Sequence, residues 1–248
     1  MRVERHASVG STNSLAFDRA RSGDPGHLWI IAGEQTAGRG RRGREWASPT
    51  GNLFASYLMV SPEPRERMGE LPLVTAVALA EAIDNCAGTY HMSKLKWPND
   101  LLVDGAKLSG ILLEAETMAN GRTALVLGVG VNCVTHPEQS LYPCTDLASL
   151  GYRVSAQQLF DVFARGLHSW IETWRRTTGF EGVRKAWLSR AAHLGQTITV
   201  RNGSKDLTGV FDDLDSRGHL VLSLENGHRE TIFAGDVFLQ GSQPDGSP

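Results

Sequence analysis

The chain has 248 residues, and its 25 lysines and arginines against 27 aspartates and glutamates leave a net charge of −2 with neutral histidines. This length accommodates one large domain with a small additional unit, and the near-neutral charge argues against a general nucleic-acid-binding protein, whose whole surface would be basic. The three cysteines, Cys86, Cys133 and Cys144, have no spacing suited to zinc, so we expect them to be reduced and mostly buried.

The N-terminal stretch MRVERHASVGSTNSL lacks the apolar core of a signal peptide. Residues 27–33 and 52–60 are rich in β-branched and aromatic residues and are bounded by glycine or proline, which predicts two strands. Residues 71–86 have a proline near their start and then an alanine-rich apolar run, which predicts a helix buried on most sides against the sheet. Because Glu81 and Asp84 interrupt this run well before membrane-spanning length, we expect a cytoplasmic protein.

The middle of the chain predicts a hairpin, another strand and a long helical region. Residues 94–116 resemble two strands joined by a two-residue turn at 104–105, because Asp-Gly readily supplies the positive φ angles of a tight turn. Residues 123–132 predict a strand apolar enough to be central in the sheet. Residues 155–192 have helical spacing with one broad apolar face and a break at Gly179, so their apolar residues are assigned to the core.

From Gly195 the pattern changes to short strands separated by turn signals. These signals are Asn202-Gly203, Ser216-Arg217-Gly218 and Asn226-Gly227. Closely spaced strands of this kind predict a small β-barrel. We therefore divide the chain into a main domain at 1–192, a barrel at 193–240 and a disordered tail at 241–248.

The segment GRGRRGREW at 38–46, the arginine loop, places four arginines and three glycines ahead of a tryptophan. The guanidinium groups repel one another and the glycines make ordering costly, so we expect the empty loop to be mobile. An anion reverses this balance, because arginine and backbone N–H groups donate charge-assisted hydrogen bonds to it. The spacing matches neither a P-loop nor a GxGxxG fingerprint. Alone, the loop is as typical of a solvated basic turn or a nucleic-acid patch as it is of an anion-binding loop.

Several further motifs accompany the arginine loop in a fixed order along the chain. They are STN at 11–13, Gln35 before the loop, Trp46 at its end, SPTGNL at 48–53, KWPNDLL at 96–102, KLSGIL at 107–112 and GVGVN at 128–132. Together these residues closely resemble biotin protein ligase, and the resemblance spans residues 8–133 in motifs and extends more loosely through the C-terminal barrel. It implies an α+β fold: a class II synthetase-like catalytic domain, with helices on a mixed, largely antiparallel sheet, followed by a small SH3-like β-barrel.

The resemblance implies an enzyme that activates biotin with ATP. Biotin carboxylate would attack the α-phosphate, pyrophosphate would leave, and a lysine of a biotin carboxyl carrier protein would attack the mixed anhydride. Since carboxylate and triphosphate repel each other, the site must supply positive charge and Mg²⁺, which gives the arginine loop a physical purpose. No ligand set for the metal is evident in the sequence, so the ATP phosphates are expected to hold it.

The resemblance also assigns biotin contacts to particular positions. They are Ser11, Thr12, Asn13, Gln35, Gly38, Arg39, Gly40, Arg41, Lys107 and Gly110. Ser11 to Asn13 and Gln35 would bind the fused-ring head, and the segment from Gly38 to Arg41 would close over biotin and the adenylate phosphate. The alternative for Ser11 to Asn13 is a helix N-cap, and both roles are compatible; the alternative for Gln35 is an ordinary surface glutamine.

The nucleotide contacts implied by the resemblance are Arg41, Arg44, Trp46, Asn99, Asp100, Lys107 and Asn132. Of these, Arg41, Lys107 and Asp100 are assigned to catalysis. Arg41 would contact the phosphate, and Lys107 would pair with the biotin carboxylate and then with phosphate oxygens as charge develops. Asp100 would assist the incoming lysine or hold metal, and the sequence leaves both open. The alternatives are a core position for Trp46, a solvated strand-end Lys107, and a turn or N-cap role for residues 99–100.

Other functions compete with this interpretation. A lipoate ligase shares the implied architecture and the adenylate chemistry but would have a glycine-rich segment without this run of arginines. A biotin or nucleotide sensor without turnover would not need Lys107 and the arginine loop aimed at a phosphate in transfer. An RNA-binding patch would show steep salt dependence and no ATP requirement.

The resemblance also bears on partners. Some members of the family carry an N-terminal winged helix that represses transcription, but ten residues precede Ser11, too few for such a module. We therefore expect neither DNA nor membranes as partners. Family members can dimerise through the sheet edge, so a homodimer is possible. The expected protein partner is a biotin carboxyl carrier domain of acetyl-CoA carboxylase or a related carboxylase.

Overall fold

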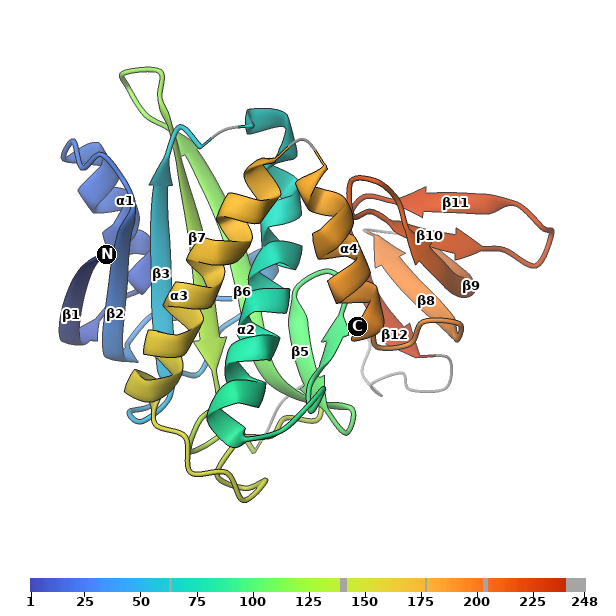
Figure 1. Ribbon diagram of the computed structural model, residues 1–248, viewed down its shortest axis with the longest axis horizontal. Helices are drawn as coiled ribbons and strands as arrows, with labels where there is room; N and C mark the ends of the chain where they lie inside the picture. The colour runs from blue at the N-terminus through green and yellow to red at the C-terminus, as the bar shows by residue number, and fades with distance from the viewer. Residues whose placement is uncertain (63, 139–141, 177, 203–204, 240–248) are drawn as a thin grey trace.

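The computed structural model describes residues 1–62, 64–138, 142–176, 178–202 and 205–239. Gly203 of the expected Asn202-Gly203 turn and the expected disordered tail at 241–248 lie outside these residues. Figure 1 shows a large twisted sheet with helices packed across it, and a smaller sheet at the C-terminal end of the chain, beyond α4 (Gly179–Ser189). This is the mixed α+β arrangement that the sequence predicts.

The main sheet has seven strands in the order β1-β2-β3-β7-β6-β5-β4, and each neighbouring pair is antiparallel except β1 with β2. The strands are β1 Arg2–Val9, β2 Leu28–Gln35, β3 Leu53–Val60, β4 Lys94–Lys96, β5 Asp100–Val103, β6 Ala106–Thr117 and β7 Thr123–Val131. All nine residues of β7 are buried, because this strand is the middle one. Its predicted central position is confirmed.

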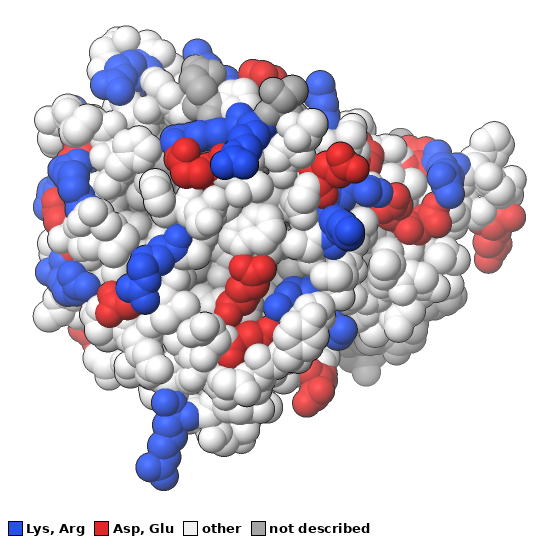
Figure 2. Space-filling view, in the orientation of Figure 1, with Lys and Arg blue, Asp and Glu red and all other residues white. Residues whose placement is uncertain are grey.

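Helices cover both faces of this sheet. They are α1 Thr12–Arg21, α2 Leu71–Ala87, α3 Ala156–Arg175 and α4, with short 3-10 turns at Arg41–Gly43 and Arg65–Glu70. Because strand side chains alternate between the two faces, Trp29 of β2 points to α3, and its ring centre lies 5.3 Å from that of Phe160. Leu28 and Ile30 point to the other face and join the cluster that includes Phe17 of α1. Figure 2 shows acidic and basic side chains interspersed over the α2–α3 face.

The β5–β6 hairpin has the predicted turn. Asp104 and Gly105 have φ angles of 49° and 80°, which a tight Asp-Gly turn requires. The break in the long helical region also falls where predicted, since α3 ends at Arg175 and α4 begins at Gly179. The edge strand β1 was not predicted, because its sequence RVERHASV alternates too little to signal a strand.

The C-terminal unit is a five-stranded antiparallel sheet in the order β11-β10-β9-β8-β12. Its strands are β8 Thr197–Asn202, β9 Lys205–Leu214, β10 Leu220–Ser223, β11 Arg229–Ile232 and β12 Asp236–Leu239. One of its contacts with the main unit is made by Trp97, whose Nε1 donates a hydrogen bond to the Gly218 carbonyl oxygen at 3.0 Å. The predicted all-β unit is confirmed, while the exact division at residue 193 stays a prediction.

Two further expectations concern the cysteines, expected to be reduced and mostly buried, and the helices, none of which was expected to span a membrane. The three cysteines are unpaired, but only Cys133 is buried, whereas Cys86 and Cys144 are half-buried. Burial raises the pKa of Cys133 to about 12, so this thiol stays protonated. Within the parts of the chain that the structure describes, no helix is long and apolar enough to cross a membrane.

Candidate functional site

A pocket of about 490 Å³ opens on the α1 side of the main sheet. Its walls come from the start of α1, the end of β2, the arginine loop, the β5–β6 hairpin, β7 and the start of β12. Fourteen of the predicted site residues line it: Ser11, Thr12, Asn13, Gln35, Arg39, Gly40, Arg41, Arg44, Trp46, Asn99, Asp100, Lys107, Gly110 and Asn132. Gly38 is the one predicted site residue that does not line the pocket. Segments from both ends of the chain therefore meet at one site.

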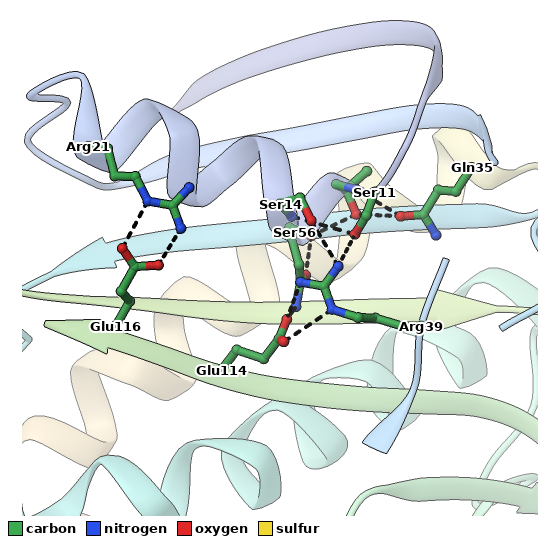
Figure 3. Close-up of polar contacts among 10 residues, drawn as sticks. Ser11, Ser14, Arg21, Gln35, Arg39, Ser56, Glu114 and Glu116 are labelled. Atoms are coloured by element: carbon green, nitrogen blue, oxygen red, sulfur yellow. Dashed lines mark hydrogen bonds and ion pairs between the residues drawn. The ribbon is translucent and has the colours of Figure 1, made fainter. Parts of the chain in front are cut away.

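One end of the pocket is a network of neutral polar groups (Figure 3). Gln35 Oε1 accepts hydrogen bonds from the Thr12 backbone N–H and hydroxyl at 2.8 and 3.0 Å. Ser56, which is fully buried, places its Oγ 2.7 Å from Thr12 Oγ1 and 2.6 Å from Asn13 Oδ1. Ser11 is the N-cap of α1, which confirms the N-cap role, while the assignment of this motif to biotin stays a prediction. The network offers donors and acceptors to a neutral polar ligand.

The arginine loop folds back on itself. Arg39 forms an isolated β-bridge with Glu45, and residues Arg41–Gly43 form a single 3-10 turn. Gly38 lies at a tight point, since a Cβ there would be 2.7 Å from the Trp46 carbonyl oxygen. Packing within the loop thus accounts for the glycine at 38.

Three arginines of the loop converge on Asp236 at the start of β12. Arg42 and Arg44 contact its carboxylate at 3.0 and 3.3 Å, and Arg41 Nη1 lies 3.6 Å from it. Repulsion among the arginines, taken alone, predicts a mobile empty loop. The structure differs because Asp236, 194 residues beyond Arg42 in the chain, supplies the opposing charge.

Arg41 is the most enclosed of these three arginines, with 23% of its side chain exposed. Its Nη1 donates to Asn99 Oδ1 at 3.2 Å and to the Gly235 carbonyl oxygen at 3.3 Å. Burial lowers the pKa of Arg41, while the nearby Asp236 and Asp100 carboxylates oppose that shift. A guanidinium remains protonated at neutral pH, so the pocket holds a permanent, partly desolvated positive charge.

Lys107 lies two residues after the Asp-Gly turn, and its side chain reaches Asp100 on the neighbouring strand. The Nζ is 2.8 Å from Asp100 Oδ1 and 5.3 Å from the centre of the Trp46 ring. Only 23% of the Lys107 side chain is exposed, so the solvated strand-end alternative does not describe it. The ammonium group therefore lies between a carboxylate and an aromatic face, both of which attract a cation.

Trp46 lies against glycines of two strands. A Cβ on Gly130 would be 2.5 Å from the indole Nε1, and one on Gly110 would be 3.1 Å from its Cζ3. The side chain is half-buried and lines the pocket, so the alternative of a core tryptophan does not hold. Within the described residues, its Nε1–H has no hydrogen-bond acceptor.

The two predicted asparagines also hold the backbone around the pocket. Asn99 Nδ2 donates to the Ile111 carbonyl oxygen at 2.7 Å, and its Oδ1 accepts from Arg41. Asn132 is buried, and its Nδ2 donates to the Thr145 carbonyl oxygen at 3.0 Å. Both side chains therefore position the wall, in agreement with the turn role considered for Asn99.

The pocket and near-pocket residues that sequence reasoning missed include Lys96, Asp236, Ser56 and Glu114. Lys96 opens the KWPND motif, which is the signal that could have found it. Its Nζ lies 5.1 Å from the centre of the Tyr142 ring, and burial lowers the pKa of Lys96. The other three have no local signal, because their contacts come from distant segments.

Charge in the pocket favours an anionic ligand. Five cationic side chains line it against three carboxylates: Arg39, Arg41, Arg44, Lys96 and Lys107 against Glu45, Asp100 and Asp236. Among the residues that the structure describes, no three His, Cys, Asp or Glu side chains are grouped as a metal site. Asp100 and Asp236 line the pocket but are ion-paired with Lys107 and with three arginines, so the phosphates of ATP would supply most of the oxygens that hold Mg²⁺.

The chain is similar to known proteins over both of its parts. Residues 6–132 match the Biotin/lipoate A/B protein ligase family, and residues 193–240 match the Biotin protein ligase C terminal domain. The chain is 37% identical to a biotin–[acetyl-CoA-carboxylase] ligase of Paracoccus denitrificans, covering 95% of this chain and 99% of that protein. A ligase of the same name from Mycobacterium tuberculosis is 32% identical, with 93% and 86% covered. The structure of biotin protein ligase from Aquifex aeolicus in complex with biotin and ATP has a TM-score of 0.81 and 25% identity, covering 96% of this chain and 98% of that one.

Proposed function

This chain belongs to the biotin/lipoate A/B protein ligase family, and from that premise we propose that it attaches biotin to a lysine of a carrier protein in two ATP-dependent steps. In the first step, a biotin carboxylate oxygen bonds to the α-phosphorus of ATP, and the bond to pyrophosphate breaks. In the second step, the carrier amine attacks the acyl carbon of biotinyl-5′-AMP. An amide forms, AMP leaves, and the nitrogen loses a proton to solvent or to a base.

The observation that carries this proposal is the division of one pocket into a polar end, where Arg39 is paired with Glu114, and a cationic end. The polar network of Thr12, Asn13, Gln35 and Ser56 suits a ureido head, which both donates and accepts hydrogen bonds. The cationic end, with Arg41 and the Lys107–Asp100 pair, suits a carboxylate next to a triphosphate. A ligand that is polar at one end and acidic at the other fits this arrangement.

The residues take the following roles in this proposal. Lys107 lowers the repulsion between the carboxylate and the α-phosphate, and Arg41 holds the adenylate phosphate until transfer. Asp100 holds Lys107 in place and is the candidate group that assists the incoming lysine of the carrier. Mg²⁺ bound to ATP would neutralise charge on the leaving pyrophosphate. Trp46, which is half-buried and lines the pocket, would pack against adenine.

The same polar network favours binding of biotin over lipoate. The dithiolane ring of lipoate has no N–H or C=O group, so it would gain none of the hydrogen bonds that the polar network could form with a ureido head, and it should bind more weakly. Biotin is therefore the proposed substrate. The proposed partner is a biotin carboxyl carrier domain, and the enzyme is proposed to act in the cytoplasm without binding DNA. A homodimer stays a prediction.

The test is incubation of the purified protein with biotin, ATP, Mg²⁺ and a biotin carboxyl carrier domain, while the carrier mass is followed. A parallel reaction contains lipoate. We expect a mass gain with biotin alone, and none when ATP is omitted. A gain with lipoate would overturn the choice of substrate. Saturable biotin binding without any gain would favour a sensor.

Alanine substitutions at Gly128 and Gly130 should affect the KM values for biotin and ATP separately. A Cβ on Gly128 would lie 2.3 Å from Asn13 Oδ1, whereas one on Gly130 would lie 2.5 Å from the Trp46 indole. We expect Gly128→Ala to raise the KM for biotin about tenfold, since one or two hydrogen bonds of about 1 kcal/mol each are disturbed. Gly130→Ala should raise the KM for ATP instead. Steady-state kinetics with each substrate varied would contradict the assignment if both variants changed both KM values equally.

A further inference from the structure

Glu114, in the middle of β6, joins two parts of the site that the sequence treats separately (Figure 3). Its Oε2 accepts a hydrogen bond from Asn13 Nδ2 at 2.6 Å. Both carboxylate oxygens also accept from the Arg39 guanidinium, from Nε at 3.2 Å and from Nη2 at 2.9 Å. One carboxylate therefore contacts the polar network and the start of the arginine loop together.

The contact with Glu114 determines which way the Asn13 amide faces. Asn13 Oδ1 lies 2.6 Å from Ser56 Oγ, and its Nδ2 points to Glu114. A carboxylate has no N–H to donate, so only the amide nitrogen can face it. Gly128 leaves the space in which Asn13 lies, since a Cβ there would be 2.3 Å from Oδ1. Asn13 is thus held from three sides.

Arg39 extends the connection to the start of α1. Its Nη1 donates to Ser11 Oγ at 3.1 Å and to Ser14 Oγ at 2.8 Å, while its other nitrogens face Glu114. The Arg39 side chain is 30% exposed and that of Glu114 29%, so the pair is partly shielded from water. Partly shielded bidentate pairs between arginine and carboxylate are stronger than exposed ion pairs.

We propose that Glu114 is a positioning residue that holds the Asn13 amide and the beginning of the arginine loop in register. This inference rests on the proposed function, because it assigns Asn13 to the biotin head. A glutamine at 114 has one acceptor oxygen instead of two and adds an NH₂ group that would face the Arg39 or Asn13 donors. Its single oxygen cannot accept from Asn13 Nδ2 and from both Arg39 nitrogens, so the bidentate, charged contact with Arg39 is lost.

The same strand supplies a matched control two residues further on. Glu116 pairs with Arg21 of α1 in the same bidentate manner, through Arg21 Nε at 2.8 Å and through Nη2. Figure 3 shows the two pairs side by side between α1 and β6. Glu116 does not line the pocket, so Glu116→Gln removes an equivalent ion pair without touching the site.

The experiment compares wild type, Glu114→Gln and Glu116→Gln by kinetics and by limited trypsin digestion without ligands. For Glu114→Gln we expect the KM for biotin to rise about tenfold, as for a lost charge-assisted hydrogen bond, with the KM for ATP and kcat within about twofold. Cleavage within residues 38–46 should become about five- to tenfold faster. Glu116→Gln should match wild type in both measurements, and both variants should have similar melting temperatures.

Either of two outcomes would overturn the role of Glu114. One is kinetics and digestion of Glu114→Gln that match those of Glu116→Gln. The other is an equal rise in both KM values with a lower melting temperature, which a merely structural residue would give. If the wild-type protein fails to biotinylate any carrier, the proposed function fails. Digestion then still decides whether Glu114 anchors the loop.

Discussion

Replacing Arg41 with glycine is expected to give an enzyme that still forms biotinyl-5′-AMP but labels bystander lysines. The Arg41 side chain is partly buried in the pocket and keeps its charge there. Charge-assisted hydrogen bonds to a phosphate contribute about 1.5–3 kcal/mol each, so their loss should weaken retention of the adenylate roughly 10- to 100-fold. The measurement is biotin labelling of an added unrelated protein, read by mass or by streptavidin blot.

Arg42→Gly provides the matched control for that experiment. Arg42 belongs to the same loop, but its side chain is 45% exposed and does not line the pocket. Its φ of 57° also suits glycine. Labelling by this variant should stay confined to the carrier. If Arg41→Gly also labels the carrier alone, Arg41 does not retain the adenylate.

Lys107→Ala should reduce adenylate formation far more than biotin binding. The charge on Lys107 matters most when negative charge develops on the α-phosphate, and removal of such a group costs roughly 10²- to 10³-fold in rate. The substitution also leaves the Asp100 carboxylate without the ammonium group 2.8 Å away, so a partly buried negative charge would repel the triphosphate. Pyrophosphate release and calorimetric biotin titration would measure the two effects.

The double variant Lys107→Ala with Asp100→Asn separates these two causes. If repulsion from the unpaired carboxylate adds to the loss, the second substitution should restore part of the rate, and the two effects will not be additive. Equal losses of biotin affinity and of adenylate formation in Lys107→Ala would mean that Lys107 contributes ground-state binding only.

Local sequence predicts much of this fold because its signals act over short distances. The Asp-Gly pair at 104–105 determines a turn with positive φ angles, and continuous apolar residues identify β7 as the central strand. The motifs likewise identify most pocket residues, since each motif is a contiguous stretch. The exceptions are informative: Gly38 carries a motif position but serves loop packing, and β1 is a strand that its polar sequence conceals.

The sequence by itself determined most of the elements, the family resemblance and the chemistry that the site residues can perform. Only the tertiary structure decided which charges meet. Asp236 opposes Arg41, Arg42 and Arg44 from the other end of the chain, and Glu114 reaches both Asn13 and Arg39 across the sheet. The periodicity and propensities of a sequence predict how each side chain is oriented within its own strand or helix. Electrostatic pairing depends on distance in space, which is set by how the strands and the two sheets pack.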